Sequence, residues 1–279
     1  MAQAWAQSYE SLGTDARANR LADLLTTGKP CRGADIVATV RSAGQDGLVN
    51  VAVRLAGVAW RSGPPGSDRS WWRSLAEAGE DAAIAGGDVD GLVELLRLSG
   101  AAYAKAGDSH VADRQWRRAF AIAEQLGDQE RAAELLRAVG DLRRATGSFG
   151  RALTVFHELV SLREEQGDQL GLAEALAEIT TTMIQADRHA DAGHFLQRAC
   201  EVLPPARGPR HARALMTLGR CWDRLGEPAS AMPCYSQALA ELIDVDDGAA
   251  EQARELLAAA ANARAAIRGD GSTGRSATG

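Results

Sequence analysis

Three stretches of the chain resemble one another at a fixed spacing. They are GDVDGLVELLRLSG at 87–100, GDQERAAELLRAVG at 127–140 and GDQLGLAEALAEIT at 167–180, so consecutive copies start 40 residues apart. Looser copies are DGLVNVAVRLAG at 46–57 and PRHARALMTLG at 209–219. A period of about 20 to 50 residues indicates a solenoid, in which each unit buries its apolar face against its neighbours.

Composition and spacing both favour helices. Hydrophobic residues make up 46% of the chain but aromatic residues only 5%, and alanine, the best helix former, is abundant. In the unit that starts at 87, apolar residues form two stripes of helical spacing on either side of Gly107: Leu92, Leu95, Leu96 and Tyr103, then Ala112, Trp116 and Ala119. Gly-Asp pairs fall where helices should end and restart. We therefore expect an all-α fold in which each repeat is a pair of helices.

These residues resemble the tetratricopeptide repeat (TPR), which places small residues, a ring and a turn glycine at set spacings. The unit from 87 matches through Gly100, Tyr103, Gly107, Ala112, Trp116 and Ala119. The unit from 208 matches best, through Leu218, Gly219, Trp222, Gly226, Ala231, Tyr235 and Ala238. The unit from 127 keeps Gly140, Gly147, Ala152 and Phe156. The unit from 167 keeps Ala192, Leu196, Ala199 and Pro204, but glycines are replaced by Thr180 and Asp187.

The resemblance implies a right-handed α-solenoid, a superhelix of TPR-like helix hairpins. Because the period exceeds the usual length of about 34 residues, the helices should be longer, as in kinesin light chains and the helical tails of bacterial STAND-type signalling NTPases. We expect five repeats, at 46–86, 87–126, 127–166, 167–207 and 208–243. Around them we expect capping helices in 1–45, a closing helix in 244–268 and a disordered tail in 269–279. Pro233 should bend its helix or shift the start of that helix.

The charge balance opposes a general attraction to nucleic acid or to anionic membranes. The formal net charge is −6, and the basic residues are arginines except for Lys29 and Lys105. With the abundant alanine, this suggests a high-GC bacterial, actinobacterial-like origin. No leader-like or membrane-spanning stretch is evident, which favours the cytoplasm. The four cysteines lie far apart, as expected of reduced thiols.

No complete catalytic, phosphate-binding or metal-binding motif is present, so we expect no enzyme activity and no cofactor. One stretch is rich in groups that bind metals or react with oxidants: His194, Cys200, His211, Cys221 and Cys234. On the repeat, the cysteines fall at packing positions and the histidines at the surface, which favours a structural role. A metal site or a redox pair is the alternative.

In the TPR family, the first helix of each repeat lines a concave groove. The positions carried over by register include nine basic residues: Arg54, Arg61, Arg97, Lys105, Arg137, Arg144, Arg213, Arg220 and Arg224. Arginine binds carboxylates with two parallel hydrogen bonds, so such a groove would suit an acidic peptide. The alternative is that the charges neutralise one another, because Glu94 and Glu134 stand three residues before Arg97 and Arg137.

Trp71 and Trp72 form a second candidate contact site. Neighbouring residues on a helix point about 100° apart, so one indole should enter the core and the other should be more exposed. An exposed tryptophan is a good anchor for a partner. The alternative is that both pack beneath the Pro-Gly loop at 62–68.

The leading hypothesis is a non-catalytic scaffold or adaptor that binds an acidic or extended segment of a partner protein. The alternative is a regulatory sensor that binds a small ligand or a signalling peptide. A biosynthetic accessory protein or an enzyme that uses the His/Cys stretch is a weaker third hypothesis, and RNA binding is the weakest. A homodimer is left open.

Overall fold

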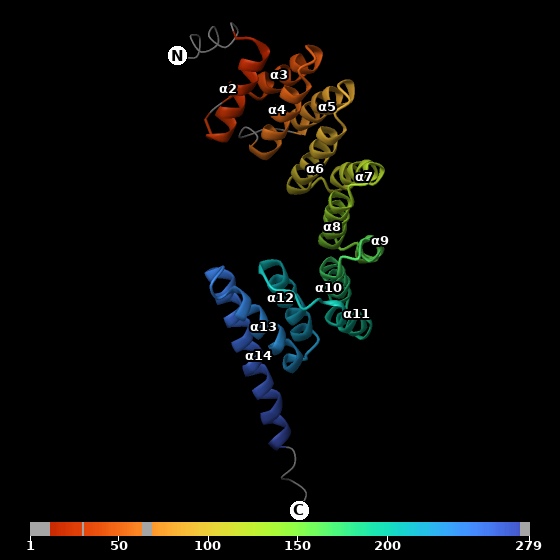
Figure 1. Ribbon diagram of the computed structural model, residues 1–279, viewed down its shortest axis with the longest axis vertical. Helices are drawn as coiled ribbons and strands as arrows, with labels where there is room; N and C mark the ends of the chain where they lie inside the picture. Colours follow the sequence, from red (N-terminus) through yellow and green to blue (C-terminus); the bar gives the residue numbers. More distant parts are fainter. Residues whose placement is uncertain (1–11, 30, 63–68, 274–279) are drawn as a thin grey trace, which may run out of the picture. The chain divides into compact units, whose positions relative to one another are not determined.

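The computed structural model describes residues 12–29, 31–62 and 69–273, with side chains described as far as 267 (Figure 1). All regular secondary structure in these residues is helical. The first helices are α2 (Thr14–Thr26), α3 (Gly33–Gln45), α4 (Val49–Ser62), α5 (Arg69–Ala85), α6 (Val89–Lys105), α7 (Ser109–Leu126) and α8 (Gln129–Ala145). They are followed by α9 (Phe149–Gln166), α10 (Gln169–Gln185), α11 (His189–Val202), α12 (Pro209–Arg224), α13 (Pro228–Leu242) and α14 (Asp247–Thr273). The predicted all-α fold of helix hairpins is confirmed.

The Gly-Asp pairs end one helix and start the next, as the sequence predicts. Gly127 and Gly167 close α7 and α9 in the left-handed conformation, with φ of 70° and 67°. Asp168, one residue later, accepts a 2.9 Å hydrogen bond from the N–H of Gly171 and so caps α10. Asp187, which stands where a turn glycine is usual, adopts the same left-handed region at φ 59°.

The chain divides into two compact units, Met1–Leu142 and Arg143–Gly279, and each is described by itself. In the first unit, α2, α4 and α6 pack side by side, and α3 packs against α5. Each hairpin is also closed, since α2 packs on α3, α4 on α5 and α6 on α7. The core consists of small and branched side chains, among them Leu21, Ile36, Leu55, Leu75 and Leu96.

In the second unit, α10 packs against α9, α11 and α12, while α13 packs against α12 and α14. The start of α14 closes this unit through the buried alanines Ala250 and Ala253, which contact Met216 and Leu242. The helix continues to Thr273, beyond the predicted end at 268. The rest of the predicted tail, 274–279, lies outside the described residues. Pro233 lies inside α13, which begins at Pro228.

A ring of the second helix rests on a glycine of the first in two of the best-matching hairpins. A β-carbon added to Gly219 would come within 2.5 Å of the Tyr235 ring, and one added to Gly100 would collide with Trp116. The polar ends of both rings are satisfied. Trp116 Nε1 donates to the carbonyl of Arg97 at 3.0 Å, and the Tyr235 hydroxyl donates to Asp223 at 2.6 Å. Burial, followed by the bond to Asp223, raises the pKa of Tyr235.

His211 is buried, which corrects the expectation that it lies at the surface. Its ring is 2% exposed and its Nδ1 lies 2.9 Å from a carboxylate oxygen of Glu241, which is itself 6% exposed. Glu241 also accepts a hydrogen bond from the N–H of Gly208 at 3.3 Å. The pair therefore joins α12 to α13 inside the second unit.

The Gly219–Tyr235 contact predicts that Gly219→Ala destabilises the protein by about 1–3 kcal/mol, because the buried ring has to move. The matched control is Gly193→Ala in α11, where nothing lies within 4 Å of the added carbon. This control should stabilise the helix by up to about 1 kcal/mol. Urea unfolding followed by circular dichroism measures both, and equal stability of the two variants would contradict the ring contact.

The buried pair predicts that Glu241→Ala lowers the free energy of unfolding by about 3 kcal/mol or more, because it strands the buried His211. Ser236→Ala changes an exposed residue of the same helix and should alter stability by less than about 0.5 kcal/mol. Urea titrations of the two variants test this difference. If Glu241→Ala lowers the free energy of unfolding no more than Ser236→Ala does, the His211–Glu241 pair contributes little to stability.

Candidate functional site

The predicted groove arginines of α4 and α6 are engaged by acidic or amide groups in the first unit. Arg54 donates a 2.5 Å hydrogen bond to the Asn19 side chain and lies 3.8 Å from Asp15, both on α2. Arg97 donates two hydrogen bonds of 2.8 Å to Glu94. For these two arginines the charges are paired within the unit.

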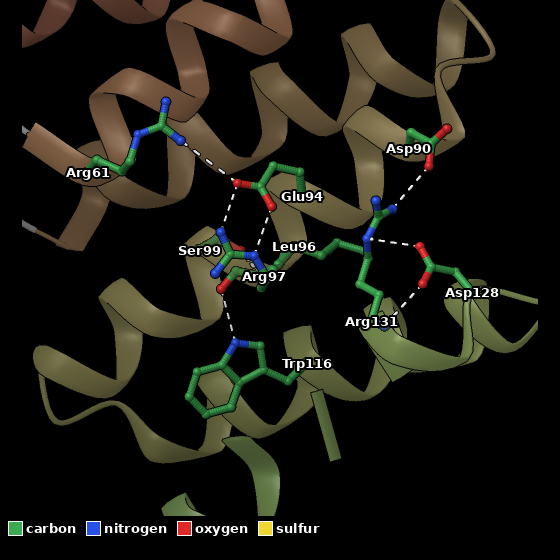
Figure 2. Close-up of polar contacts among 9 residues, drawn as sticks. All are labelled: Arg61, Asp90, Glu94, Leu96, Arg97, Ser99, Trp116, Asp128 and Arg131. Atoms are coloured by element: carbon green, nitrogen blue, oxygen red, sulfur yellow. Dashed lines mark hydrogen bonds and ion pairs between the residues drawn. The ribbon is translucent and has the colours of Figure 1, made fainter. Parts of the chain in front are cut away.

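Figure 2 shows Glu94 between two cations, with Arg61 of α4 on one side and Arg97 on the other. Arg61 lies 3.8 Å from Glu94. The hydrogen bond to Glu94 raises the pKa of Arg97, and the charge of Glu134 adds to this effect. Arg137 is half-buried, whereas Lys105 is exposed and has no ion pair among the described residues.

Two ion pairs of the first unit involve an arginine that is not among the predicted groove residues. Arg131 of α8 lies 3.0 Å from Asp90 and 3.3 Å from Asp128 (Figure 2). Asp128 is the helix-start aspartate of the repeat, and its side chain also accepts a bond from the N–H of Arg131. This ion pair is indicated in the sequence by the spacing, because Arg131 stands three residues after Asp128.

Arg144 of the second unit is also paired. It donates a 2.6 Å hydrogen bond to Glu178 of α10, and its guanidinium lies 5.4 Å from the centre of the Phe156 ring. Arg210, which sequence reasoning missed, binds both oxygens of Glu174 at 3.0 and 2.9 Å. The acidic residues of α10 are thus occupied by neighbouring arginines.

Arg213, Arg220 and Arg224 of α12 differ from the other groove candidates. All three are exposed, and no carboxylate among the described residues lies within ion-pair distance of them. Within the part of the chain that the structure describes, Arg220 donates a 3.4 Å hydrogen bond to Thr217, and the side chains of the other two have no polar contact. We call these three residues the α12 arginine face.

Helix geometry places the α12 arginine face in one line. At 3.6 residues per turn, positions 7 and 11 residues after Arg213 point within about 20° of its direction. With a rise of about 1.5 Å per residue, the three Cα atoms span about 16 Å. Other sides of α12 are packed, since Ala212, Leu215 and Met216 are buried in a cluster with residues of α13 and α14. The arginines therefore project from a helix with a fixed position in this unit.

Not every position carried over by register lies on an open surface. The register also assigns Ala177, Ile184 and Met216 to the groove, but these three residues are buried, with exposures of 2%, 5% and 3%. Ala177 and Ile184 lie on α10, which packs against α12, as the contact of Thr181 with Cys221 at 3.5 Å also shows. Met216 packs against α13 and α14. The candidate surface is consequently narrower than the repeat pattern predicts.

Trp71 and Trp72 both lie half-buried in an aromatic cluster of the first unit. The Trp72 ring stacks on Trp60 with centroids 4.8 Å apart, and Trp71 meets Trp72 edge-on at 4.6 Å. Trp60 also lies 5.7 Å from Tyr103. Trp71 leaves no room for a side chain at Gly33. Both indoles thus contribute to packing, and neither is fully exposed.

The cysteines and histidines of the second unit separate into distinct environments. Cys221 is buried and His194 is exposed, as expected, whereas Cys200 and Cys234 come together. Among the residues that the structure describes, no three His, Cys, Asp or Glu side chains are grouped so that they could hold a metal ion. Over the same residues, no helix is both long and apolar enough to cross a membrane.

Comparisons with solved structures agree with this fold. A STAND protein with a tetratricopeptide repeat sensor from Pyrococcus horikoshii has a TM-score of 0.51 and 14% identity; the match covers 88% of this chain and 40% of that protein. BtubC from P. vanneervenii has a TM-score of 0.49 and 17% identity, with 79% and 92% covered. The TPR2AB domain of yeast Sti1 has a TM-score of 0.36 and 15% identity, with 82% and 99% covered. No protein-family model and no curated protein matches the chain. The STAND protein and this chain share a fold, which consists of TPR-like helical repeats.

Proposed function

We propose that the protein is a non-catalytic scaffold that binds an acidic, extended segment of a partner protein on the α12 arginine face. One observation carries the proposal. Arg213, Arg220 and Arg224 are exposed and lack a carboxylate partner among the described residues, whereas Arg54, Arg61, Arg97 and Arg144 have acidic partners. Unneutralised guanidinium groups are available to a ligand, and paired ones are not.

The spacing of the three arginines suits an extended chain. An extended peptide advances about 3.3 Å per residue, so about five residues cover the α12 arginine face. Each guanidinium can bind a carboxylate with two parallel hydrogen bonds. Acidic side chains spread over such a segment would therefore reach all three cations.

The overall charge of the protein favours a local site. With a net charge of −6, most of the surface repels an acidic peptide, and attraction is restricted to places where arginine is unpaired. Exposed ionic contacts are screened by salt over about 10 Å at 0.1 M ionic strength. Binding should consequently weaken as the salt concentration rises.

A regulatory sensor is the second candidate, and a pocket in the second unit favours it. The pocket lies between α9 and α11 and is lined by His157, His194 and Phe195. Both histidine rings meet Phe195 edge-on, at 5.6 and 5.9 Å. A small ligand that binds here would raise the melting temperature, and the effect would disappear in Phe195→Ala. Acidic-peptide binding on α12 would be unaffected by that substitution.

The main test is the affinity for a fluorescein-labelled, glutamate-rich octapeptide, measured by fluorescence anisotropy at low salt. Replacing Arg213, Arg220 and Arg224 by glutamate should weaken binding by about tenfold or more, since a single tenfold step corresponds to about 1.4 kcal/mol. The same peptide with glutamine in place of glutamate should bind the unmodified protein weakly.

The matched control replaces three other exposed arginines, Arg41, Arg114 and Arg151, by glutamate. It makes the same change in net charge at positions away from α12, so it separates a local site from a general charge effect. Circular dichroism confirms folding of both variants. Equal loss of affinity in the two triple variants, or full affinity in the α12 variant, would overturn the proposal.

A further inference from the structure

Two cysteines from neighbouring hairpins meet in the second unit. Cys200 lies on α11 and Cys234 on α13, and the two side chains line one cavity and influence each other's ionisation. Both side chains are half-buried, so they are neither sealed in the core nor fully exposed. The spacing in the sequence gave no indication of this contact, because 34 residues separate the two.

The two thiols line one surface cavity of about 330 Å³. Its other lining residues include Leu203, Pro204 and Pro205, which form the connection from α11 to α12, and the buried His211. A small molecule the size of a peroxide can enter a cavity of this volume. The sulfur atoms are therefore within reach of a small oxidant.

The surroundings make the two sulfur atoms unequal. Two neighbours, Cys234 and Trp222, favour the thiolate form of Cys200. Cys234, and then Trp222, lower the pKa of Cys200 to about 7, although burial and the charge of Glu201 oppose this. The interaction with Cys200, and then burial, raise the pKa of Cys234. Cys200 is the better nucleophile, because the thiolate is the reactive form.

The charged groups around the pair come from three helices. The charge of Glu201 on α11 acts on Cys200, and that of Asp223 on α12 acts on Cys234. His211 of α12 lines the same cavity, where it is bound to Glu241 of α13. The acidic groups therefore oppose ionisation of the thiols, and the other neighbours of Cys200 favour it.

We propose that Cys200 and Cys234 are a thiol-oxidation site that forms an intramolecular disulfide when the protein meets a peroxide. The Cys200 thiolate attacks one oxygen of hydrogen peroxide, the O–O bond breaks, and after protonation a sulfenic acid and one water result. The Cys234 sulfur then attacks the sulfenic sulfur, and its proton and the hydroxyl leave as a second water. Two thiols are oxidised by two electrons, and one peroxide is reduced to two waters.

The disulfide would tie α11 to α13, the second helices of two consecutive hairpins. Helix α12 lies between them in sequence and packs against both, so the disulfide would restrict the movement of α11 and α13 relative to α12. The other two cysteines are not placed for this chemistry. Cys221 is buried and bonded to Thr181, and Cys31 lies on the other compact unit, where burial and Asp35 raise its pKa.

The first experiment uses the unmodified protein, which removes any question of folding. The reduced protein is treated with hydrogen peroxide under native conditions, alkylated and digested without reductant for mass spectrometry. We expect a cross-linked peptide pair that contains Cys200 and Cys234, and a fall from four alkylated cysteines to two. Persistence of all four thiols, or a disulfide that involves Cys31 or Cys221, would overturn the proposal.

The second experiment tests the order of attack. In Cys234→Ser the sulfenic acid of Cys200 has no resolving thiol, so dimedone should label Cys200. In Cys200→Ser, dimedone should leave Cys234 unlabelled over the same time. Cys221→Ser is the matched control and should still form the disulfide. If dimedone labels Cys234 in Cys200→Ser but does not label Cys200 in Cys234→Ser, then Cys234 is the attacking thiol and the assigned order is wrong.

Discussion

The structure depends on the close approach of the two helices within a hairpin, and in the hairpins α6–α7 and α12–α13 a residue without a side chain faces an aromatic ring. At Gly219 the ring of Tyr235 occupies the space that a β-carbon would need, and Gly100 and Trp116 repeat the contact. Each ring also fixes its polar end, on Asp223 or on a backbone carbonyl. Close packing therefore determines the angular positions of α6 and α12, and with them the directions in which their exposed residues point.

Charge pairing then decides which of those exposed residues are available. Arg54 and Arg61 of α4 find acidic or amide partners on neighbouring helices, Arg97 pairs with Glu94 of its own helix α6, and Arg144 pairs with Glu178 of α10. The exposed pairs of Arg54, Arg61 and Arg97 add little stability, typically below about 1 kcal/mol each. Their larger effect is to neutralise part of the cationic surface. The α12 arginine face keeps its charge because α10 offers its acids to Arg144 and Arg210 instead.

The fold was largely predictable because its determinants are local and periodic. Turn glycines, helix-start aspartates and ring positions recur at one spacing, so helix existence and pairing follow from the sequence alone. The contacts that decide the candidate sites are not local. Arg54 meets Asp15 and Asn19 of an earlier hairpin, and His211 is buried because Glu241 lies opposite it. The register of a single repeat contains no information on such partners, nor on the meeting of Cys200 with Cys234.

The most direct measurement is the location at which an acidic peptide contacts the protein. A glutamate-rich octapeptide with a photoreactive benzophenone at its centre is irradiated with the protein, and the cross-linked peptides are identified by mass spectrometry. Binding on the α12 arginine face predicts cross-links at 209–224 that a glutamine analogue does not produce. Cross-links concentrated on α4 and α6, where the arginines are already paired, would contradict it.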